Sequence, residues 1–232
     1  MSKNQISIII PTYNEEENIG RLVKTLQDSQ AGYVSEIIVA DGGSSDQTKK
    51  ISEENGAIFY SCSKKGRAEQ MNEGASVASS PLFYFLHADT IPPRGFDKLI
   101  VNAINNGAGA GCFRLRFDEN QPLLTFYAWF TKFRFTLFRF GDQSLFVSKK
   151  IFEKVEGFDE SLIVMEDQEI VWHIKRETSF KIIEKNVETS ARKYRKNGVF
   201  RLQFIFTVIL IGYYLGAKQS TLAHLYSSLI KI

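Results

Sequence analysis

Four short apolar runs, separated by segments of helical periodicity, dominate the first part of this chain. The run at residues 6–10 is apolar at almost every position, and residues 37–40, 57–60 and 82–86 repeat the pattern. Strands that are covered by helices on both faces are apolar throughout, whereas half-exposed strands alternate. Residues 19–26, after the first run, carry apolar side chains at helical spacing. This alternation predicts an α/β fold, with a mostly parallel sheet flanked by helices.

The second half of the chain is less regular. Helices are expected at residues 99–105, 126–140 and 167–176, and strands at residues 109–117, 145–147 and 181–183. From residue 198 onward, the pattern indicates two helices outside the sheet. We therefore expect one main domain over residues 1–197. Residues 198–232 form a C-terminal helical extension, packed on that domain or on a membrane surface.

Composition excludes several classes of protein. The net charge of +3 over 232 residues is too small for a nucleic-acid-binding protein. Cys62 and Cys112 have no close spacing and no neighbouring His cluster, so we expect two reduced thiols. The polar N-terminus carries no apolar signal-peptide core, which favours a cytoplasmic location.

Polar turns follow three of the predicted strands. They are residues 11–15, Pro-Thr-Tyr-Asn-Glu; residues 41–46, Asp-Gly-Gly-Ser-Ser-Asp; and residues 87–89, His-Ala-Asp. Each turn alone is explained by the preference of Asn, Asp and Ser for helix starts. Because parallel strands end at one edge of a sheet, three such turns together predict a ligand site there. Asp41 could accept hydrogen bonds from a base or a ribose.

His87 and Asp89 flank one small residue at the end of a predicted strand. Side chains two apart in a strand point to one face, so this pair could share a divalent ion. His87 is equally compatible with an ordinary hydrogen-bonded histidine. Asp89 is the stronger candidate, because a hard cation bound to a diphosphate needs a carboxylate oxygen.

Glu166 and Asp167 stand immediately before an apolar-periodic segment. Acidic residues are favoured at a helix N-terminus by the helix dipole alone. These two, however, follow the apolar residues 162–165, so the acids emerge directly from the core. That position makes a general base possible.

These blocks together resemble the inverting family 2 glycosyltransferases, which have a GT-A fold. The resemblance is carried by residues 8–16, 36–48, 66–75 and 157–167, with a Gly-Asp-Gln block at residues 141–143 as in a small bacterial subgroup. The chain has neither a Gly-x-Gly-x-x-Gly fingerprint nor a P-loop, so a nucleotide must be held otherwise.

The resemblance implies a role for each matching residue. The predicted nucleotide-sugar-binding residues are Pro11, Thr12, Tyr13, Glu15, Asp41, Arg67, Asp142 and Gln143. Asp89 would be the metal-binding acid of an Asp-x-Asp motif, and Asp167 the catalytic base, with Glu166 beside it. His87 stands where that motif has its first Asp. This departure leaves the metal open between Mn²⁺ and Mg²⁺, since imidazole suits Mn²⁺ better.

The expected function is transfer of a sugar from a nucleotide-diphosphate sugar to an acceptor hydroxyl, with inversion and metal assistance. UDP-sugars are favoured and GDP-sugars remain open. The alternative is a non-catalytic nucleotide-sugar or carbohydrate binder on the same fold, which the His87 departure alone supports. A nucleotidyltransferase is disfavoured, because residues 11–17 lack a Gly-rich basic phosphate loop.

Basic residues precede the uncharged stretch 202–217, which is too short to span a bilayer. A buried or amphipathic helix explains this stretch. A helix lying on an anionic membrane, joined by the basic-aromatic residues 132–140, would also explain it and would suit a lipid-linked acceptor. In that case the protein would work at the inner face of the membrane.

Overall fold

The computed structural model describes residues 4–231 except 134, 137, 138 and 140. The strands are β1 (Ile6–Thr12), β2 (Val34–Asp41), β3 (Ile58–Ser61), β4 (Leu82–Phe85), β5 (Thr90–Ile91), β6 (Ala110–Phe117), β7 (Leu145–Ser148) and β8 (Phe180–Thr189). The helices are α1 (Ile19–Ser29), α2 (Thr48–Glu54), α3 (Arg67–Val77), α4 (Phe96–Asn105), α5 (Pro122–Trp129), α6 (Lys149–Lys154), α7 (Glu166–Glu177), α8 (Arg192–Asn197), α9 (Val199–Tyr214) and α10 (Gln219–Leu229). The 3₁₀ turns given bounds among the described residues are η1 (Phe130–Lys132) and η3 (Gly141–Gln143).

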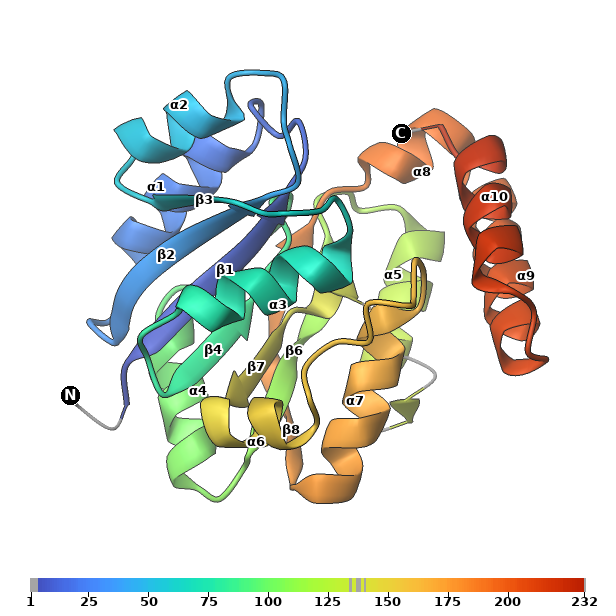
Figure 1. Cartoon of the computed structure of the whole chain (residues 1–232). Helices are drawn as coiled ribbons and strands as arrows, with labels where there is room; N and C mark the ends of the chain where they lie inside the picture. The colour runs from blue at the N-terminus through green and yellow to red at the C-terminus, as the bar shows by residue number, and fades with distance from the viewer. Residues whose placement is uncertain (1–3, 134, 137–138, 140, 232) are drawn as a thin grey trace.

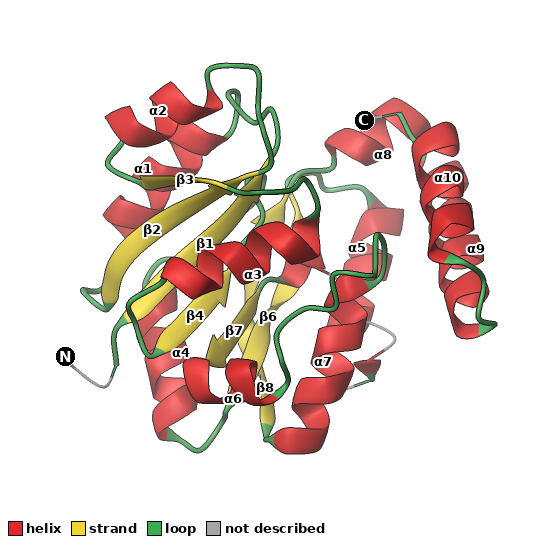
Figure 2. Cartoon of the chain, in the orientation of Figure 1, coloured by secondary structure: helices red, strands yellow, loops and turns green. Residues whose placement is uncertain are grey.

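The described strands join one sheet in the order β3-β2-β1-β4-β7-β6-β8-β5. β1 pairs in parallel with β2 and β4, and β2 pairs in parallel with β3. Strand β7 runs antiparallel to both β4 and β6, while β6 and β8 are parallel. The fold class is therefore confirmed as a mostly parallel α/β sheet with helices on both faces (Figures 1 and 2).

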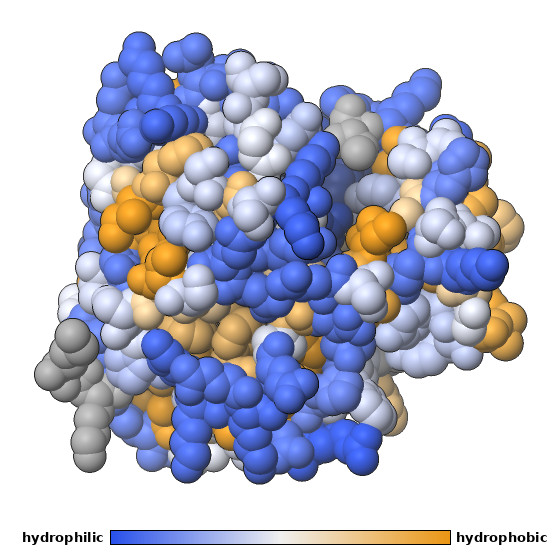
Figure 3. Space-filling model, viewed as in Figure 1, coloured by the Kyte–Doolittle hydropathy of each residue, from blue (hydrophilic) through white to orange (hydrophobic). Residues whose placement is uncertain are grey.

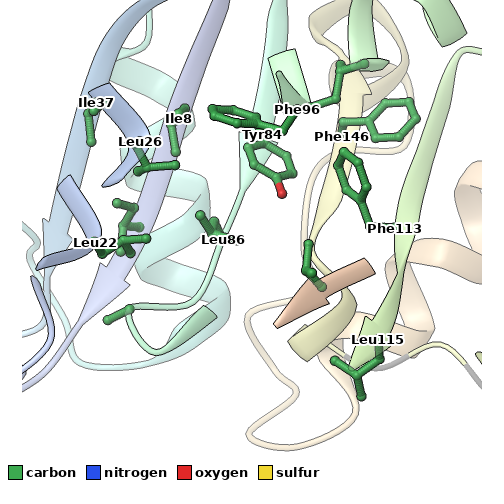
Figure 4. Close-up of a cluster of buried hydrophobic side chains, with 14 of the residues drawn as sticks. Ile8, Leu22, Leu26, Ile37, Tyr84, Leu86, Phe96, Phe113, Leu115 and Phe146 are labelled. Carbon is green, nitrogen blue, oxygen red and sulfur yellow. The ribbon is translucent and has the colours of Figure 1, made fainter. Parts of the chain in front are cut away.

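Strand β1 is buried along its whole length because a hydrophobic core lies on each side of it. Ile8 and Ile10 face the cluster that α1 and α4 cover, which Figure 4 shows together with aromatic residues of β4, β6 and β7. Ile9 faces the opposite cluster, which is covered by α3, α6 and α7. This two-sided burial explains the continuously apolar run, since successive side chains of a strand alternate between faces. Both cysteines are free, as predicted.

The prediction of a helix over residues 126–140 is wrong for most of the residues in this range that the structure describes. Helix α5 ends at Trp129 and continues only as the turn η1. Residues 134, 137, 138 and 140, which belong to the predicted helix and to the predicted membrane-facing run, lie outside the described residues. Arg139, in contrast, is almost fully buried. A buried arginine that bonds to backbone carbonyls favours an irregular chain path over a helix with a solvated face.

Helices α9 and α10 form a hairpin beside the main sheet (Figure 1). Leu202, Ile205 and Ile209 of α9 are buried against Leu222 of α10. Residues Val164 and Met165, just before α7, also pack against this cluster. The hairpin thus covers the chain segment that leads into the predicted catalytic acids. Within the described part of the chain, no helix combines the length and the apolar character required to cross a membrane.

Candidate functional site

Asp41 organises the loops that follow β1 and β2. Its carboxylate is 2% exposed and accepts hydrogen bonds from the Thr12 hydroxyl (3.0 Å) and from the backbone N–H groups of Gly43 and Ser44 (2.9 and 2.7 Å). The amide of Gln70, from α3, donates to the Thr12 carbonyl (2.7 Å). These bonds fix the shape of the sheet edge. Direct contact between Asp41 and a nucleotide stays a prediction.

Tyr13 and Glu15 line the same edge in different ways. The Tyr13 ring is exposed, with the Lys65 ammonium 3.2 Å from its centroid. Glu15 is partly buried and accepts a hydrogen bond from the Asn18 amide (2.6 Å). Burial raises the pKa of Glu15, although Asn18 and Arg192, whose guanidinium lies 3.8 Å from its carboxylate, oppose this. An exposed ring beside buried polar groups suits a flat base with a ribose.

His87, Gly141 and Asp167 come together although they are far apart in the sequence. A Cβ atom on Gly141 would lie 2.5 Å from Nε2 of His87 and closer still to Oδ2 of Asp167. All three residues line one small cavity with Pro11, at the end of β1. Thus the end of β1, the turn after β4, the 3₁₀ turn η3 and the start of α7 meet at one place. The structure brings the predicted base close to the predicted metal ligand.

An ion pair between the first residues of two helices positions the acidic residues. Arg67, the first residue of α3, lies 3.2 Å from the carboxylate of Glu166, the first residue of α7. Glu166 is almost fully buried, whereas Arg67 is partly exposed. Burial raises the pKa of Asp167, the adjacent Glu166 carboxylate raises it further, and Arg67 only partly opposes this. Met165, before the helix, has a left-handed backbone (φ 75°), a strained conformation typical of functional sites.

His87 and Asp89 lie in a turn and not on a strand, because β4 already ends at Phe85. The N–H of Thr90 donates to the His87 carbonyl (3.1 Å) and closes this turn. The expected sharing of one strand face is therefore wrong, but the two side chains still interact, since the Asp89 carboxylate affects the pKa of His87.

The donor set fits a divalent ion that a diphosphate also binds. Burial, followed by the charge of Arg67, lowers the pKa of His87, so its imidazole stays neutral and keeps a lone pair for a metal. Among the residues described, no three His, Cys, Asp or Glu side chains gather into a metal cage. An ion of this kind needs only one or two protein ligands when substrate phosphates complete its coordination.

Asp142 and Gln143 have different surroundings. Asp142 lines one cavity together with Glu166 and Asp167, and its charge helps to raise the pKa of Asp167. Gln143 is 1% exposed, and its Oε1 accepts a hydrogen bond from the Arg139 guanidinium (2.6 Å). The predicted contact of Gln143 with a nucleotide sugar is therefore weakened, because that oxygen is engaged inside the protein.

Sequence reasoning missed three residues of the site. Arg139 also donates to the Thr131 carbonyl (2.6 Å), and it lines the small cavity beside His87 and Asp167. Lys193 influences the pKa values of Glu15 and His87. Gly141 allows His87 and Asp167 to approach. Gly141 belongs to the Gly-Asp-Gln block at residues 141–143, which the sequence did single out. Arg139 and Lys193 lie among other basic residues, so nothing in the sequence distinguishes them.

A larger cavity of about 400 Å³ lies between the acidic centre and the C-terminal hairpin. Asp142, Glu166 and Asp167 line one end of it. Six aromatic residues of β6, α5, η1, α8, α9 and α10 line much of the rest; they are Phe117, Tyr127, Phe130, Tyr194, Phe206 and Tyr226. The acids therefore stand between a small polar cavity and a larger aromatic one.

Comparison with known proteins gives consistent matches. The family model described as "Glycosyl transferase family 2" matches residues 7–152. A dolichol-phosphate mannosyltransferase from Pyrococcus furiosus is 34% identical over 109 residues, which are 45% of this chain and 31% of that protein. The chain thus matches only about a third of the length of this curated relative.

Solved structures share the fold at low sequence identity. Glucosyl-3-phosphoglycerate synthase from Mycobacterium tuberculosis, in complex with Mn²⁺, UDP and glucosyl-3-phosphoglycerate, aligns with a TM-score of 0.63 and 17% identity, covering 92% of this chain and 81% of that one. A mannosyltransferase from Pyrobaculum calidifontis, in complex with GDP-Man and Mn²⁺, aligns with a TM-score of 0.67 and 16% identity, covering 89% and 62%.

Proposed function

Because the chain belongs to glycosyl transferase family 2, we propose that it moves a sugar from a nucleotide-diphosphate sugar to an acceptor hydroxyl, with inversion. The observation that carries this proposal is the approach of Asp167 to His87 across Gly141. A carboxylate base and a candidate ligand for a diphosphate-bound metal thereby lie at one strand-end cleft. A purely non-catalytic binder is disfavoured, since it has no use for a buried carboxylate with a raised pKa beside this ligand.

In the proposed mechanism, Asp167 accepts the proton of the acceptor hydroxyl as the hydroxyl oxygen attacks the anomeric carbon. The bond from that carbon to the diphosphate oxygen breaks, and the electron pair leaves with the diphosphate. Attack from the side opposite the leaving group inverts the anomeric centre. The ion pair of Arg67 and Glu166 fixes α7 against α3 and holds Asp167 in place. A divalent ion held by His87 and Asp89 would neutralise charge on the leaving group.

On the donor side, we propose a UDP-sugar, with a GDP-sugar as the second candidate, and Mn²⁺ or Mg²⁺ as the ion. The support comes from the two solved relatives described above, which hold UDP or GDP-Man together with Mn²⁺. The exposed Tyr13 ring offers a stacking face for a base.

A thermal-shift screen of nucleotide-diphosphate sugars with Mn²⁺ tests the donor assignment. A donor at 100 times its Kd should stabilise the folded protein by about 2.7 kcal/mol, and the shift should shrink when EDTA is added. Nucleoside monophosphates serve as the control, because they lack the diphosphate that would complete the metal site. Equal shifts with and without EDTA would remove the metal from the proposal.

We also propose that residues 198–232 form an extension whose outer surface rests on an anionic membrane at the cytoplasmic side, where a lipid-linked acceptor could reach the site. Phe200, Phe204 and Ile211 are exposed and spaced to share one face of α9, and the exposed Leu215 directly follows this helix. Figure 3 shows hydrophobic residues along the outer edge of the hairpin. Lys196 is exposed at its base, where it could meet lipid phosphates, whereas the neighbouring Arg195 pairs with Glu119 (2.7 Å).

Flotation with anionic liposomes tests this surface in the full-length chain. Replacing Phe200 and Phe204 by Ser should lower recovery with the liposomes by about tenfold or more, because two large apolar side chains no longer enter the interface. The control replaces Ile58 and Val77, which are also exposed but lie far from α9 in the sequence, by Ser. Equal recovery of both double variants would rule out this surface as the membrane contact.

A further inference from the structure

The cavity between the acidic centre and the C-terminal hairpin has a chemical character of its own. It has the size of a small-molecule site, about 400 Å³, and six aromatic side chains line it. The rings contact one another: Tyr194 lies edge-on to Phe117 (5.3 Å between centroids) and to Phe206 (6.3 Å), and Phe206 stacks near Tyr226 (6.5 Å). The aromatic surface is therefore continuous from β6 to α10.

Two pairs of polar side chains on these walls bond to each other. The Tyr194 hydroxyl donates to Oε1 of Gln203 (3.2 Å), and the Lys193 ammonium donates to the Tyr226 hydroxyl (3.2 Å). A sugar or another polyhydroxylated acceptor would need a bonding partner for each hydroxyl that it buries. The ring faces and the aliphatic side chains of Leu115, Val164, Ile209 and Leu210, which make up much of the lining, offer no such partner, so an apolar body suits this surface better.

The charged groups at the catalytic end point to a neutral acceptor atom. Asp142, Glu166 and Asp167 all line this end. Of the cations that line the cavity, Arg67 pairs with Glu166, and the guanidinium of Arg139 bonds to Gln143 and to a backbone carbonyl. The ammonium of the third, Lys193, donates to the Tyr226 hydroxyl. A phosphate placed against Asp167 would meet three carboxylates at this end of the cavity, and this repulsion favours a neutral acceptor atom there.

We propose that the acceptor is a neutral hydroxyl carried directly on an apolar body, and that this body seats in the aromatic cavity. The proposal rests on the glycosyl-transfer function proposed above and narrows its acceptor class. The hydroxyl meets Asp167 at the acidic end, and the apolar body extends towards the cavity walls that α9 and α10 contribute. An amphiphile in solution and a membrane lipid share this chemistry, and the test separates them.

The test measures release of nucleoside diphosphate by the full-length protein, using the donor selected in the thermal-shift screen. Four probes are compared: 1-octanol, octyl phosphate, glycerol, and diacylglycerol in phosphatidylcholine vesicles. We expect 1-octanol or diacylglycerol to raise release at least about tenfold above the rate without acceptor, and whichever is faster identifies the source. Octyl phosphate exceeding 1-octanol, or glycerol equalling it, would overturn the proposal.

A variant pair ties the effect to the cavity. Thr207 on α9 is exposed and lines the cavity, whereas Thr221 on α10 is exposed and is not among the lining residues. Thr207→Trp should lower stimulation by the accepted probe about tenfold, and Thr221→Trp should leave it unchanged, each relative to its own release without acceptor. Equal stimulation of both variants would contradict the assignment.

The two levels of the proposal fail in different ways. If no nucleotide-diphosphate sugar binds or is hydrolysed, the transfer function itself is wrong. If a donor binds and is hydrolysed but neither 1-octanol nor diacylglycerol accelerates release, the transfer function stands and the apolar-acceptor proposal is wrong.

Discussion

Replacement of Asp167 by Asn should lower release of nucleoside diphosphate from the donor by about 10²–10⁴-fold, with the fold and donor binding retained. Asn keeps the size and shape of the side chain but cannot take a proton. The position is poised for this role, since burial and the adjacent Glu166 raise the pKa of the Asp167 carboxyl. A base with a raised pKa holds a proton more tightly and so abstracts it from a hydroxyl more readily.

The matched control is Asp28→Asn, which makes the same chemical change on an exposed position of α1. It should leave the rate unchanged. Thermal-shift titration with the donor checks that both variants still bind it. An Asp167→Asn variant that binds the donor and releases nucleotide at the full rate would show that another group acts as the base.

The first half of the fold could be predicted because sequence and tertiary structure agree there. β1 is apolar throughout since clusters cover both of its faces, and α1 buries Ile19, Leu22, Val23 and Leu26 at helical spacing. In both elements the spacing of the apolar residues in the sequence follows directly from which side chains are buried. In the second half, β7 inserts antiparallel between β4 and β6. Nothing in its short apolar sequence specifies that direction.

The aromatic segment after residue 126 shows why local pattern failed. Its frequent Phe residues and scattered basic residues are typical of an amphipathic helix, but Arg139 is drawn inside to bond with Gln143 and the Thr131 carbonyl. Backbone carbonyls carry no sequence signal, so a buried cation of this kind cannot be told from a solvated one. Tertiary contacts outweighed propensity here.

The acidic residues of the candidate site could be predicted from the sequence, but the residues that position them could not. Asp41, Asp89 and Asp167 were identified because carboxylates at strand ends and at a helix start indicate chemistry. Lys193 looked like one charge in a solvated basic run, yet it lines the aromatic cavity. Lys193 belongs to the candidate site because the fold brings it close to residues that are distant in the sequence, and its residue type does not reveal this. An argument from sequence identifies chemical groups more readily than the partners that position them.

Replacement of Gly141 by Ala should cost on the order of 10²-fold in nucleotide release, although only one methyl group is added. That carbon would lie 2.5 Å from Nε2 of His87 and closer to Oδ2 of Asp167, so one of these side chains must move. Because the strain falls on the two groups that the mechanism uses, we expect activity to fall far more than stability. Release rates and thermal unfolding of the same preparation measure the two effects separately.

The double variant Gly141→Ala/Asp167→Asn shows whether the glycine acts through the base. If the methyl group works by displacing Asp167, the double variant should be no slower than Asp167→Asn alone, because residues that act as one unit are not additive. If the rate of the double variant instead falls by the product of the two single losses, the methyl group does not act through Asp167. Displacement of His87, the other close neighbour, would then explain its effect. Unchanged activity in Gly141→Ala would show that the close approach of these three residues is not required for the reaction.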